Sequence, residues 1–494
     1  MELEALARCN VRILDNAVYQ INTSVDARHL TNRLAYWEYI EQNGKCFFTQ
    51  QARYENCACS PKNKVDTPPS SIKLSNRRNL RYGVHGLHEY RGKFFPQLVR
   101  SLINSEKLES GTNILDPMCG SGTTLVEAEI LGCNAFGVDM NPLSVLMSRA
   151  KTLIAKSTPE DYLHQYSVLR ERLQNINIQD DWLSSLPEKD QIYIKNWFAP
   201  DVYKQLGPII RIINTTVDEA YSLLFKVVLS NIIRRISYQK ESDLRVRMEK
   251  NSIAWDVRQE FLKELQRSHD VLLGFLQEPK NIKSFAVVRR GDCRVLSSIV
   301  PNLIGKTDSI ITSPPYATAL PYLDTDRLSL YCLSLMSRSA HRSNDYLMIG
   351  NREITDSLRK AYWQEYIKNK NILPGDICKI IDRVDEAIHT QTVGFRRQNL
   401  PALLAKYFFD MRAVLKEVTV MLHENASAFV VVGNNHTTVG NDKIEINTHD
   451  LLYQLGESVG LTCEQMIDME MLISRDIFKD NSGTSEKIIC FRKL

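Results

Sequence analysis

The chain has 494 residues, of which 43% are hydrophobic and 24% are charged, and its formal net charge is +4. A chain of this length is expected to form two or three domains, and its composition is that of a globular rather than a disordered protein. The slight basic excess permits a nucleic-acid partner but does not predict one, because binding depends on local clustering of charge.

The first residues predict no secretory signal, because charged residues such as Glu2 and Asp15 interrupt the apolar ones. No apolar run reaches membrane-spanning length. The eleven cysteines have no framework spacing, so we expect a reduced, cytoplasmic setting. Cys46, Cys57 and Cys59 form a loose cluster without the paired spacing usual for zinc ligands, and no metal is expected.

The predicted elements begin with a mostly helical lead-in over residues 1–75, which ends in a polar, Pro- and Ser-containing stretch typical of a loop. From residue 76 the pattern changes. Short apolar runs at 112–117 and 135–139 flank a predicted helix over 121–131. This alternation predicts parallel strands joined by crossover helices.

Helical periodicity dominates after Pro142, and residues 155–283 are predicted as an inserted helical domain. One of its helices begins near Asp218 and carries apolar residues from Phe225 to Ile236 at three- and four-residue spacing. We expect an insertion this long to fold around its own apolar faces.

The strand pattern returns in the second half of the chain, interrupted by a polar, arginine-rich second insert over 335–399. Predicted strands lie at 284–288, 309–312, 428–432 and 487–491, and predicted helices at 400–423 and 448–459.

A glycine turn follows the first predicted strand directly and precedes the first helix, with the sequence DPMCGSGTT from Asp116 to Thr124. Glycine lets the backbone approach a ligand where a Cβ would collide. Asp139 ends the next strand, where a carboxylate can accept both ribose hydroxyls of a nucleoside. A tight turn without a ligand is the alternative, and the acidic strand end favours the nucleoside site.

A second motif, TSPPY at 312–316, follows the strand at 309–312. Its two prolines fix the backbone and remove two amide donors, which leaves carbonyls free at the edge where α/β enzymes bind ligands. With the Ser313 hydroxyl and the Tyr316 ring, the motif could hold a planar base that carries an amino group. A rigid loop with a partly buried tyrosine is the alternative.

In this order the motifs resemble those of the DNA amino-methyltransferases. DPMCGSGTT, GVDMNP at 137–142 and TSPPY are similar to motifs I, II and IV of that family. HEYRGKFFP at 88–96 is similar to motif X, and GDCR at 291–294 to motif III. The SPPY form resembles cytosine-N4 enzymes more than adenine-N6 enzymes, which typically carry DPPY.

The resemblance implies an α/β fold: a Rossmann-like seven-stranded methyltransferase sheet with a reversed last strand, interrupted by a helical inserted domain. The core would comprise a cofactor-binding part at 76–154, a catalytic loop at 284–334 and a C-terminal part at 400–494. The motif order is nearest the gamma arrangement of the family. We expect no recognition domain after the last strand, so the inserts at 155–283 and 335–399 are the candidates for DNA contact.

The resemblance also implies S-adenosyl-L-methionine as the methyl donor, with no metal required. The residues expected to bind it are Lys93, Phe94, Pro96, Asp116, Met118, Cys119, Gly120, Gly122, Thr123, Asp139, Met140, Asp292 and Cys293. The catalytic residues implied by the family motif are Ser313, Pro314, Pro315 and Tyr316.

The activity implied is site-specific methylation of the cytosine N4 amino group in double-stranded DNA, with base flipping. The setting would be restriction–modification or defence, with a companion restriction endonuclease as a candidate partner. Adenine-N6 methylation is the nearest alternative, and a non-catalytic DNA-binding protein that retains the fold is an alternative of another class. The expected DNA-binding residues are Arg234, Arg235, Arg245, Arg247, Arg396 and Arg397. A solvated face balanced by acidic neighbours is the competing interpretation of these clusters.

Overall fold

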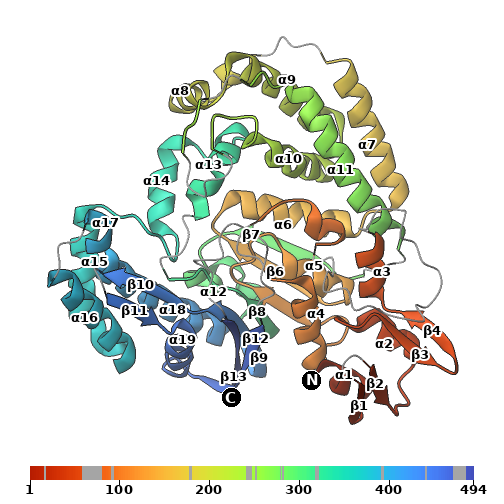
Figure 1. Cartoon of the computed structure of the whole chain (residues 1–494), viewed down its shortest axis with the longest axis vertical. Helices are drawn as coiled ribbons and strands as arrows, with labels where there is room; N and C mark the ends of the chain where they lie inside the picture. The colour runs from red at the N-terminus through yellow and green to blue at the C-terminus, as the bar shows by residue number, and fades with distance from the viewer. Residues whose placement is uncertain are drawn as a thin grey trace.

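The structure is a computed structural model of the chain. It describes residues 1–15, 18–57, 81–90, 94–176, 181–240, 247–250, 253–278, 280, 283–317, 322–390, 394–439, 442–470 and 485–494. In these ranges no helix is both long and apolar enough to cross a membrane. A twisted central sheet lies between helices, and a group of further helices stands above it in Figure 1.

The central sheet has seven strands in the order β12–β13–β9–β8–β5–β6–β7. Neighbouring strands from β9 to β7 are parallel, and β13 runs antiparallel to both of its neighbours. The strands are β5 (Asn113–Asp116), β6 (Asn134–Asp139), β7 (Ala286–Arg290), β8 (Thr307–Thr312), β9 (Leu422–Gly433), β12 (Leu461–Glu470) and β13 (Ser485–Lys493). The predicted Rossmann-like methyltransferase sheet with a reversed last strand is confirmed.

The strand order reverses between β5 and β8. From β5 the chain continues through β6 to β7 at one edge, and β8 then returns to the other side of β5. A reversal of this kind opens a crevice at the carboxyl ends of the two strands. DPMCGSGTT starts at the end of β5 and TSPPY at the end of β8, so the fold brings both motifs to this crevice.

Side chains alternate between the two faces of the sheet, and each face has its own core. Ile114 of β5 belongs to one apolar cluster and Leu115 to the other. The first face is covered mainly by α4 (Pro96–Ser105), α5 (Thr123–Ile130) and α6 (Pro142–Ala155), and the second by α12 (Leu296–Ile299), α16 (Gly375–His389), α18 (Leu400–Met421) and α19 (Thr448–Glu457).

The helices of residues 155–283 pack on the core instead of standing apart from it. They are α7 (Pro159–Gln174), α8 (Glu188–Trp197), α9 (Pro200–Thr216), α10 (Glu219–Ile233) and α11 (Val257–Gln277), in the upper part of Figure 1. Phe225 and Val228 of α10 are buried in one apolar cluster with Leu143 and Met147 of α6. The expectation that this insert folds around its own apolar faces is therefore incomplete, because α6 supplies part of its core.

Residues 335–399 contain α14 (Arg338–Leu347), α15 (Asp356–Asn369), α16 and α17 (Phe395–Gln398). Helix α13 (Tyr322–Cys332) precedes them and joins the same cluster as α6 and α10. A small hairpin, β10 (Asn435–Val439) with β11 (Asp442–Ile446), follows β9.

The N-terminal segment differs from its prediction as mostly helical. Its helices are α1 (Glu2–Ala7), α2 (Ala27–Arg33) and α3 (Gln50–Cys57), and its strands form two hairpins, β1 (Val11–Asp15) with β2 (Val18–Ile21) and β3 (Tyr39–Gln42) with β4 (Lys45–Phe48). Asn43 and Gly44 connect β3 to β4 with φ values of 53° and 71°. An Asn-Gly pair with positive φ at both residues is a strong hairpin signal, which outweighs weak helical periodicity.

A buried ion pair joins α4 to α5 on the face of the sheet that these two helices cover. Arg100 Nε donates to Glu127 Oε2 at 2.8 Å, and both side chains are fully buried. Tyr82 and His85 bind the other carboxylate oxygen at 2.7 and 2.9 Å. Burial alone would raise the pKa of Glu127, but the Arg100 charge and the hydrogen bonds outweigh it and lower the pKa to about 2.

We expect Glu127→Gln to lower the free energy of unfolding by about 3–5 kcal/mol, because it leaves the Arg100 charge buried without a counter-charge. The folded-state pKa lies below the usual value of about 4.3, so this contribution is present above that pH and is lost as the pH falls towards 2. Urea unfolding at neutral pH measures the change. Glu445→Gln, in an exposed pair with Lys443, is the control and should cost at most about 1 kcal/mol. Equal losses in the two variants would contradict the assignment.

Candidate functional site

A cavity of about 450 Å³ opens where the strand order reverses. Of the residues predicted from the sequence, its lining includes Phe94, Met118, Cys119, Gly120, Thr123, Asp139, Met140, Cys293, Ser313, Pro314, Pro315 and Tyr316. Residues from all five quoted motifs therefore share one cavity.

Some predicted residues lie elsewhere. Asp116, Gly122, Pro96 and Asp292 do not line the cavity, and Lys93 is outside the described residues. Asp116 and Gly122 instead shape the turn that lines it.

Asp116 connects the two motifs from beneath the cavity. One carboxylate oxygen accepts from the Met118 backbone N–H at 3.1 Å and from the Thr312 hydroxyl at 2.8 Å. The other accepts from the Thr124 hydroxyl at 2.7 Å. Burial raises the pKa of Asp116 to about 6 despite these hydrogen bonds. One side chain thus holds the glycine turn against the end of β8.

The glycines of the turn occupy backbone positions that other residues rarely adopt. Gly120 has a φ of 49°, and a Cβ there would lie 2.8 Å from the Tyr90 ring. Gly122 has a φ of 82°, and a Cβ there would lie 3.0 Å from the Ser148 Cα. The turn can therefore pass close to a ligand on one side while it packs against α6 on the other.

Asp139 faces the cavity at the end of β6. Each carboxylate oxygen accepts one backbone N–H, from Gly120 and from Asn141, both at 2.8 Å. The Met140 backbone N–H is a further donor to this carboxylate. A carboxylate has about four acceptor sites, so some capacity remains for ligand hydroxyls. Its enclosed position raises the pKa of Asp139 to about 6.

Asp292 lies beside the cavity and is bound within the protein. Its carboxylate binds Arg294 through both oxygens, with the Nη2–Oδ2 distance at 2.7 Å, and Arg294 also binds Asp410 at 2.6 Å. Burial would raise the pKa of Asp292, but the Arg294 hydrogen bonds and charge lower it. The adjacent Gly291 and Cys293 line the cavity instead.

The TSPPY loop is held in place by contacts from three later segments. Gly350, at a φ of 74°, approaches it so closely that a Cβ would lie 2.8 Å from the Tyr316 carbonyl oxygen. Asn435 donates a hydrogen bond to the Ala317 carbonyl. The Tyr316 hydroxyl donates to Glu486 of β13, and its ring lies against Gly433, where a Cβ would be 3.2 Å from the Tyr316 hydroxyl oxygen.

The cavity also contains residues that the sequence analysis did not select: Tyr90, Phe95, Pro117, Ser121, Asn141, Gly291, Met348, Ile349, Met469 and Glu486. Most of these are members or close neighbours of the quoted motifs and could have been included. Met469 and Glu486 come from β12 and β13, and Met348 and Ile349 follow α14. None of the quoted sequence motifs lies near these four residues in the chain.

Burial raises the pKa of the Cys119 thiol well above its usual value, so this residue packs in the turn and is a poor nucleophile. Among the described residues no group of three or more His, Cys, Asp or Glu side chains could hold a metal ion. Of the loose cysteine cluster, Cys59 and the Cys57 side chain are outside the described part.

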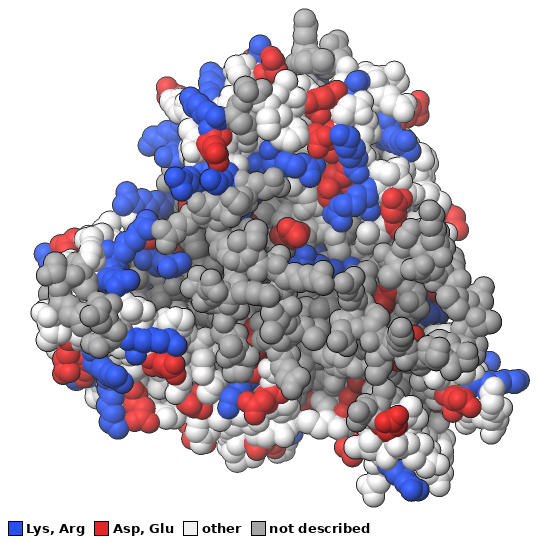
Figure 2. Space-filling model, viewed as in Figure 1, with Lys and Arg blue, Asp and Glu red and all other residues white. Residues whose placement is uncertain are grey.

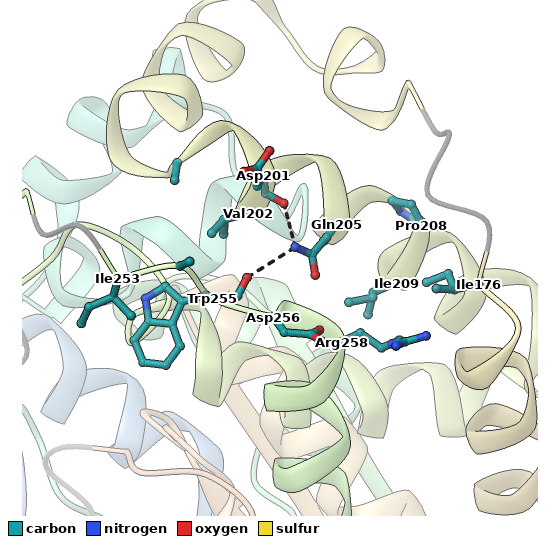
Figure 3. A pocket seen from close by; sticks show the side chains of 12 residues that line it. Ile176, Asp201, Val202, Gln205, Pro208, Ile209, Ile253, Trp255, Asp256 and Arg258 are labelled. Atoms are coloured by element: carbon teal, nitrogen blue, oxygen red, sulfur yellow. Dashed lines mark hydrogen bonds between the residues drawn. The ribbon is translucent and has the colours of Figure 1, made fainter.

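A second cavity, of about 540 Å³, lies within the helical insert, between α9 and the start of α11 (Figure 3). Gln205 Nε2 donates to the carbonyls of Asp201 and Trp255 at 3.0 and 3.4 Å. Asp256 accepts from the Gln259 N–H and so caps α11. These polar groups serve local structure, and no predicted site residue lines this cavity.

The predicted DNA-binding arginines are in different environments. Arg235 is ion-paired with Glu260 at 3.0 Å, and Arg234 donates to the Lys240 carbonyl at 3.5 Å, so both already have protein partners. Of the other predicted arginines, Arg247 and Arg397 are exposed, and Arg396 forms an exposed ion pair with Glu353. Arg245 is outside the described residues.

Comparisons with known proteins agree with the motifs. A family model described as RMKL-like, methyltransferase domain matches residues 88–165. The Type II methyltransferase M.MvaI of Kocuria varians is 25% identical over 376 residues, which cover 72% of this chain and 78% of that protein. The Type II methyltransferase M.BsoBI of Geobacillus stearothermophilus is 24% identical over 374 residues, which cover 61% of this chain and 69% of that protein.

Among solved structures, the rRNA methyltransferase aviRa from Streptomyces viridochromogenes matches with a TM-score of 0.29 and 9% identity, covering 82% of this chain and 88% of that one. The family model and the two relatives confirm the resemblance that the motifs predict.

We expect Gly122→Ala to destabilise the protein more than Gly111→Ala. Both glycines have positive φ, at 82° and 91°, so both variants carry a backbone strain of about 1–2 kcal/mol. Gly111 has no atom within 4 Å of an added Cβ, whereas Gly122 meets Ser148. The clash should add about 1–3 kcal/mol, measured by urea unfolding. The same loss in both variants would show that the turn does not depend on this close approach.

Proposed function

We propose that this chain, a methyltransferase by its motifs, sheet and relatives, transfers a methyl group from S-adenosyl-L-methionine to the N4 amino group of cytosine in double-stranded DNA. The observation that carries the proposal is the single cavity in which the Asp139 carboxylate and the TSPPY loop meet. The Asp139 end of the cavity suits a nucleoside, and the TSPPY end suits a planar base that carries an amino group.

The residues of the cavity fit S-adenosyl-L-methionine. Its volume of about 450 Å³ lies in the usual range for small-ligand sites. Asp139 has acceptor sites left for the ribose hydroxyls, and the Gly120 turn has no Cβ to block a ligand. Among the described side chains, the buried Ser121 hydroxyl has no hydrogen-bond partner, so it is a candidate to bind the cofactor. When bound, the cofactor supplies an activated methyl group on a sulfonium centre.

The chain's own residues would prepare the target amino group. An exocyclic amino nitrogen is conjugated with its ring and is a poor nucleophile. Hydrogen bonds accepted by the Ser313 hydroxyl and the Pro314 carbonyl would orient its N–H groups and favour an available lone pair. The Tyr316 ring would stack on the base, and its bond to Glu486 fixes the ring before the base arrives.

Three observations support the finer parts of the proposal. The Type II designation of the relatives supports DNA as the substrate and a restriction–modification setting, in which a companion endonuclease is a candidate partner. Ser313, where adenine-N6 enzymes typically carry Asp, favours cytosine. Intact Ser313, Pro314, Pro315 and Tyr316 in one cavity disfavour a non-catalytic DNA-binding protein. Adenine-N6 methylation is the second candidate.

We further propose that residues 155–283 and 335–399 form the DNA-facing inserts on a methyltransferase core at 76–154, 284–334 and 400–494. Arg247 and Arg397 remain proposed phosphate contacts because they are exposed. Arg396 also remains a proposed phosphate contact, because its exposed ion pair with Glu353 adds little stability and can open.

Incubating the purified protein with unmethylated DNA and S-adenosyl-L-methionine should yield N4-methylcytosine, detected by mass spectrometry of the nucleosides. Ser313→Ala should lower single-turnover rates by about tenfold to a hundredfold while cofactor affinity stays unchanged, because its hydrogen bond matters most as the nitrogen changes geometry. N6-methyladenine as the product would favour the second candidate. A folded, DNA-binding protein that modifies no base would favour the non-catalytic one.

The affinity for S-adenosyl-L-methionine should fall as the pH is lowered from 7.5 to 5. Asp139 must be ionised to accept both hydroxyls, and with a pKa of about 6 it becomes protonated below that value. The expected loss approaches about tenfold per pH unit below the pKa. Calorimetry measures it. Asp139→Asn should bind weakly with little pH dependence. If the variant keeps the wild-type pH dependence, the titrating group is another one, with Asp116 the first candidate.

A further inference from the structure

Helix α14 presents an exposed face without acidic side chains. The exposed residues Arg338, Ser339, Arg342, Ser343 and Leu347 lie on one side of the helix. Its one acidic residue, Asp345, is partly buried, and burial raises its pKa to about 6. Figure 2 shows Lys and Arg side chains gathered over α8 and α14. The Arg342 guanidinium also donates to the Tyr346 hydroxyl, and the Ser343 hydroxyl donates to the Ala340 carbonyl at 2.9 Å. This face therefore offers mainly positive charge to a partner.

The helix is anchored at its N-terminus by the helical insert. The Arg338 backbone N–H donates to the carboxylate of Asp190 in α8 at 2.7 Å, and that side chain is only 3% exposed. A carboxylate at this end also suits the helix dipole. The Arg338 guanidinium lies over the Tyr193 ring of α8, with its carbon 4.5 Å from the ring centroid.

The C-terminus of α14 is anchored by the methyltransferase core. Arg294 of the GDCR motif donates to the Leu347 carbonyl at 3.0 Å, and Lys406 donates to the Met348 carbonyl at 3.4 Å. Met348 and Ile349 then line the cavity, and Gly350 packs on Tyr316. The helix thus leads directly to the wall of the candidate active site.

We infer that this face of α14 binds the DNA duplex next to the target base, an inference that rests on the proposed DNA substrate. An α-helix fits the major groove, where Arg and Ser side chains contact phosphates and base edges. Leu347 is 50% exposed at the cavity end of the helix. It packs against the base step that the target base leaves, as apolar side chains do when they insert into DNA. Anchoring at both ends orders the helix before DNA binds, so little entropy is lost.

Fluorescence anisotropy with a labelled mixed-sequence duplex, recorded over a range of KCl concentrations, tests the charged part of this face. Arg342→Gln should weaken binding by about three- to tenfold and reduce the slope of log affinity against log salt by about one. Lys379→Gln is the matched control, because it removes one exposed charge from α16, a helix that contributes no residue to the cavity. A salt slope for Arg342→Gln equal to that of wild type would overturn the inference.

The apolar part is tested by methylation. Leu347→Ser should slow methylation of duplex DNA more than that of the same sequence as a single strand, because only the duplex requires unstacking. Equal slowing on both substrates would contradict the contact of Leu347 with the base step.

The α14 inference and the proposed reaction can fail separately. If wild type methylates DNA and Arg342→Gln leaves binding unchanged, only the α14 inference is lost. If no base is methylated but Arg342→Gln alters the salt slope, only the proposed reaction is lost.

Discussion

The carboxylate of Asp116 is the interaction on which the candidate site depends. Its oxygens bind the glycine turn through Met118, the start of α5 through Thr124, and the end of β8 through Thr312, which is 196 positions away in the chain. A buried carboxylate is costly unless its acceptor sites are occupied, so all three donors are needed to satisfy Asp116. The distance between the two motifs is thereby set by one side chain that does not itself line the cavity.

The second constraint is the shared core between α6 and the helices above it. Leu143 and Met147 of α6 are buried with α10, so the helical group cannot shift without disturbing the sheet. At the start of α6, Asn141 accepts from the Leu143 N–H and donates to Asp326 of α13 at 2.7 Å. The same residue donates its N–H to Asp139. The packing of the helical group and the position of the Asp139 carboxylate are therefore coupled through one asparagine.

Local patterns predicted the strands and turns around the crevice, because parallel strands buried on both faces are continuous apolar runs. They did not predict β12, whose sequence LTCEQMIDME mixes apolar and polar residues at the edge of the sheet. They could not show that Arg294 binds Asp292 and Asp410 together, since the second contact depends on α18 packing beside the motif. The contact between Tyr316 and Glu486, 170 positions apart, likewise exists only in the folded sheet.

The position of β13 has a consequence for the order in which the protein forms. It is inserted between β9 and β12 rather than added at an edge, so the sheet stays split until Lys493 has left the ribosome. Domains otherwise tend to fold as they are synthesised. Until then Tyr316 lacks its Glu486 partner and one wall of the cavity is missing. A truncated product that lacks this strand would therefore keep the glycine turn but would lack part of the cavity lining.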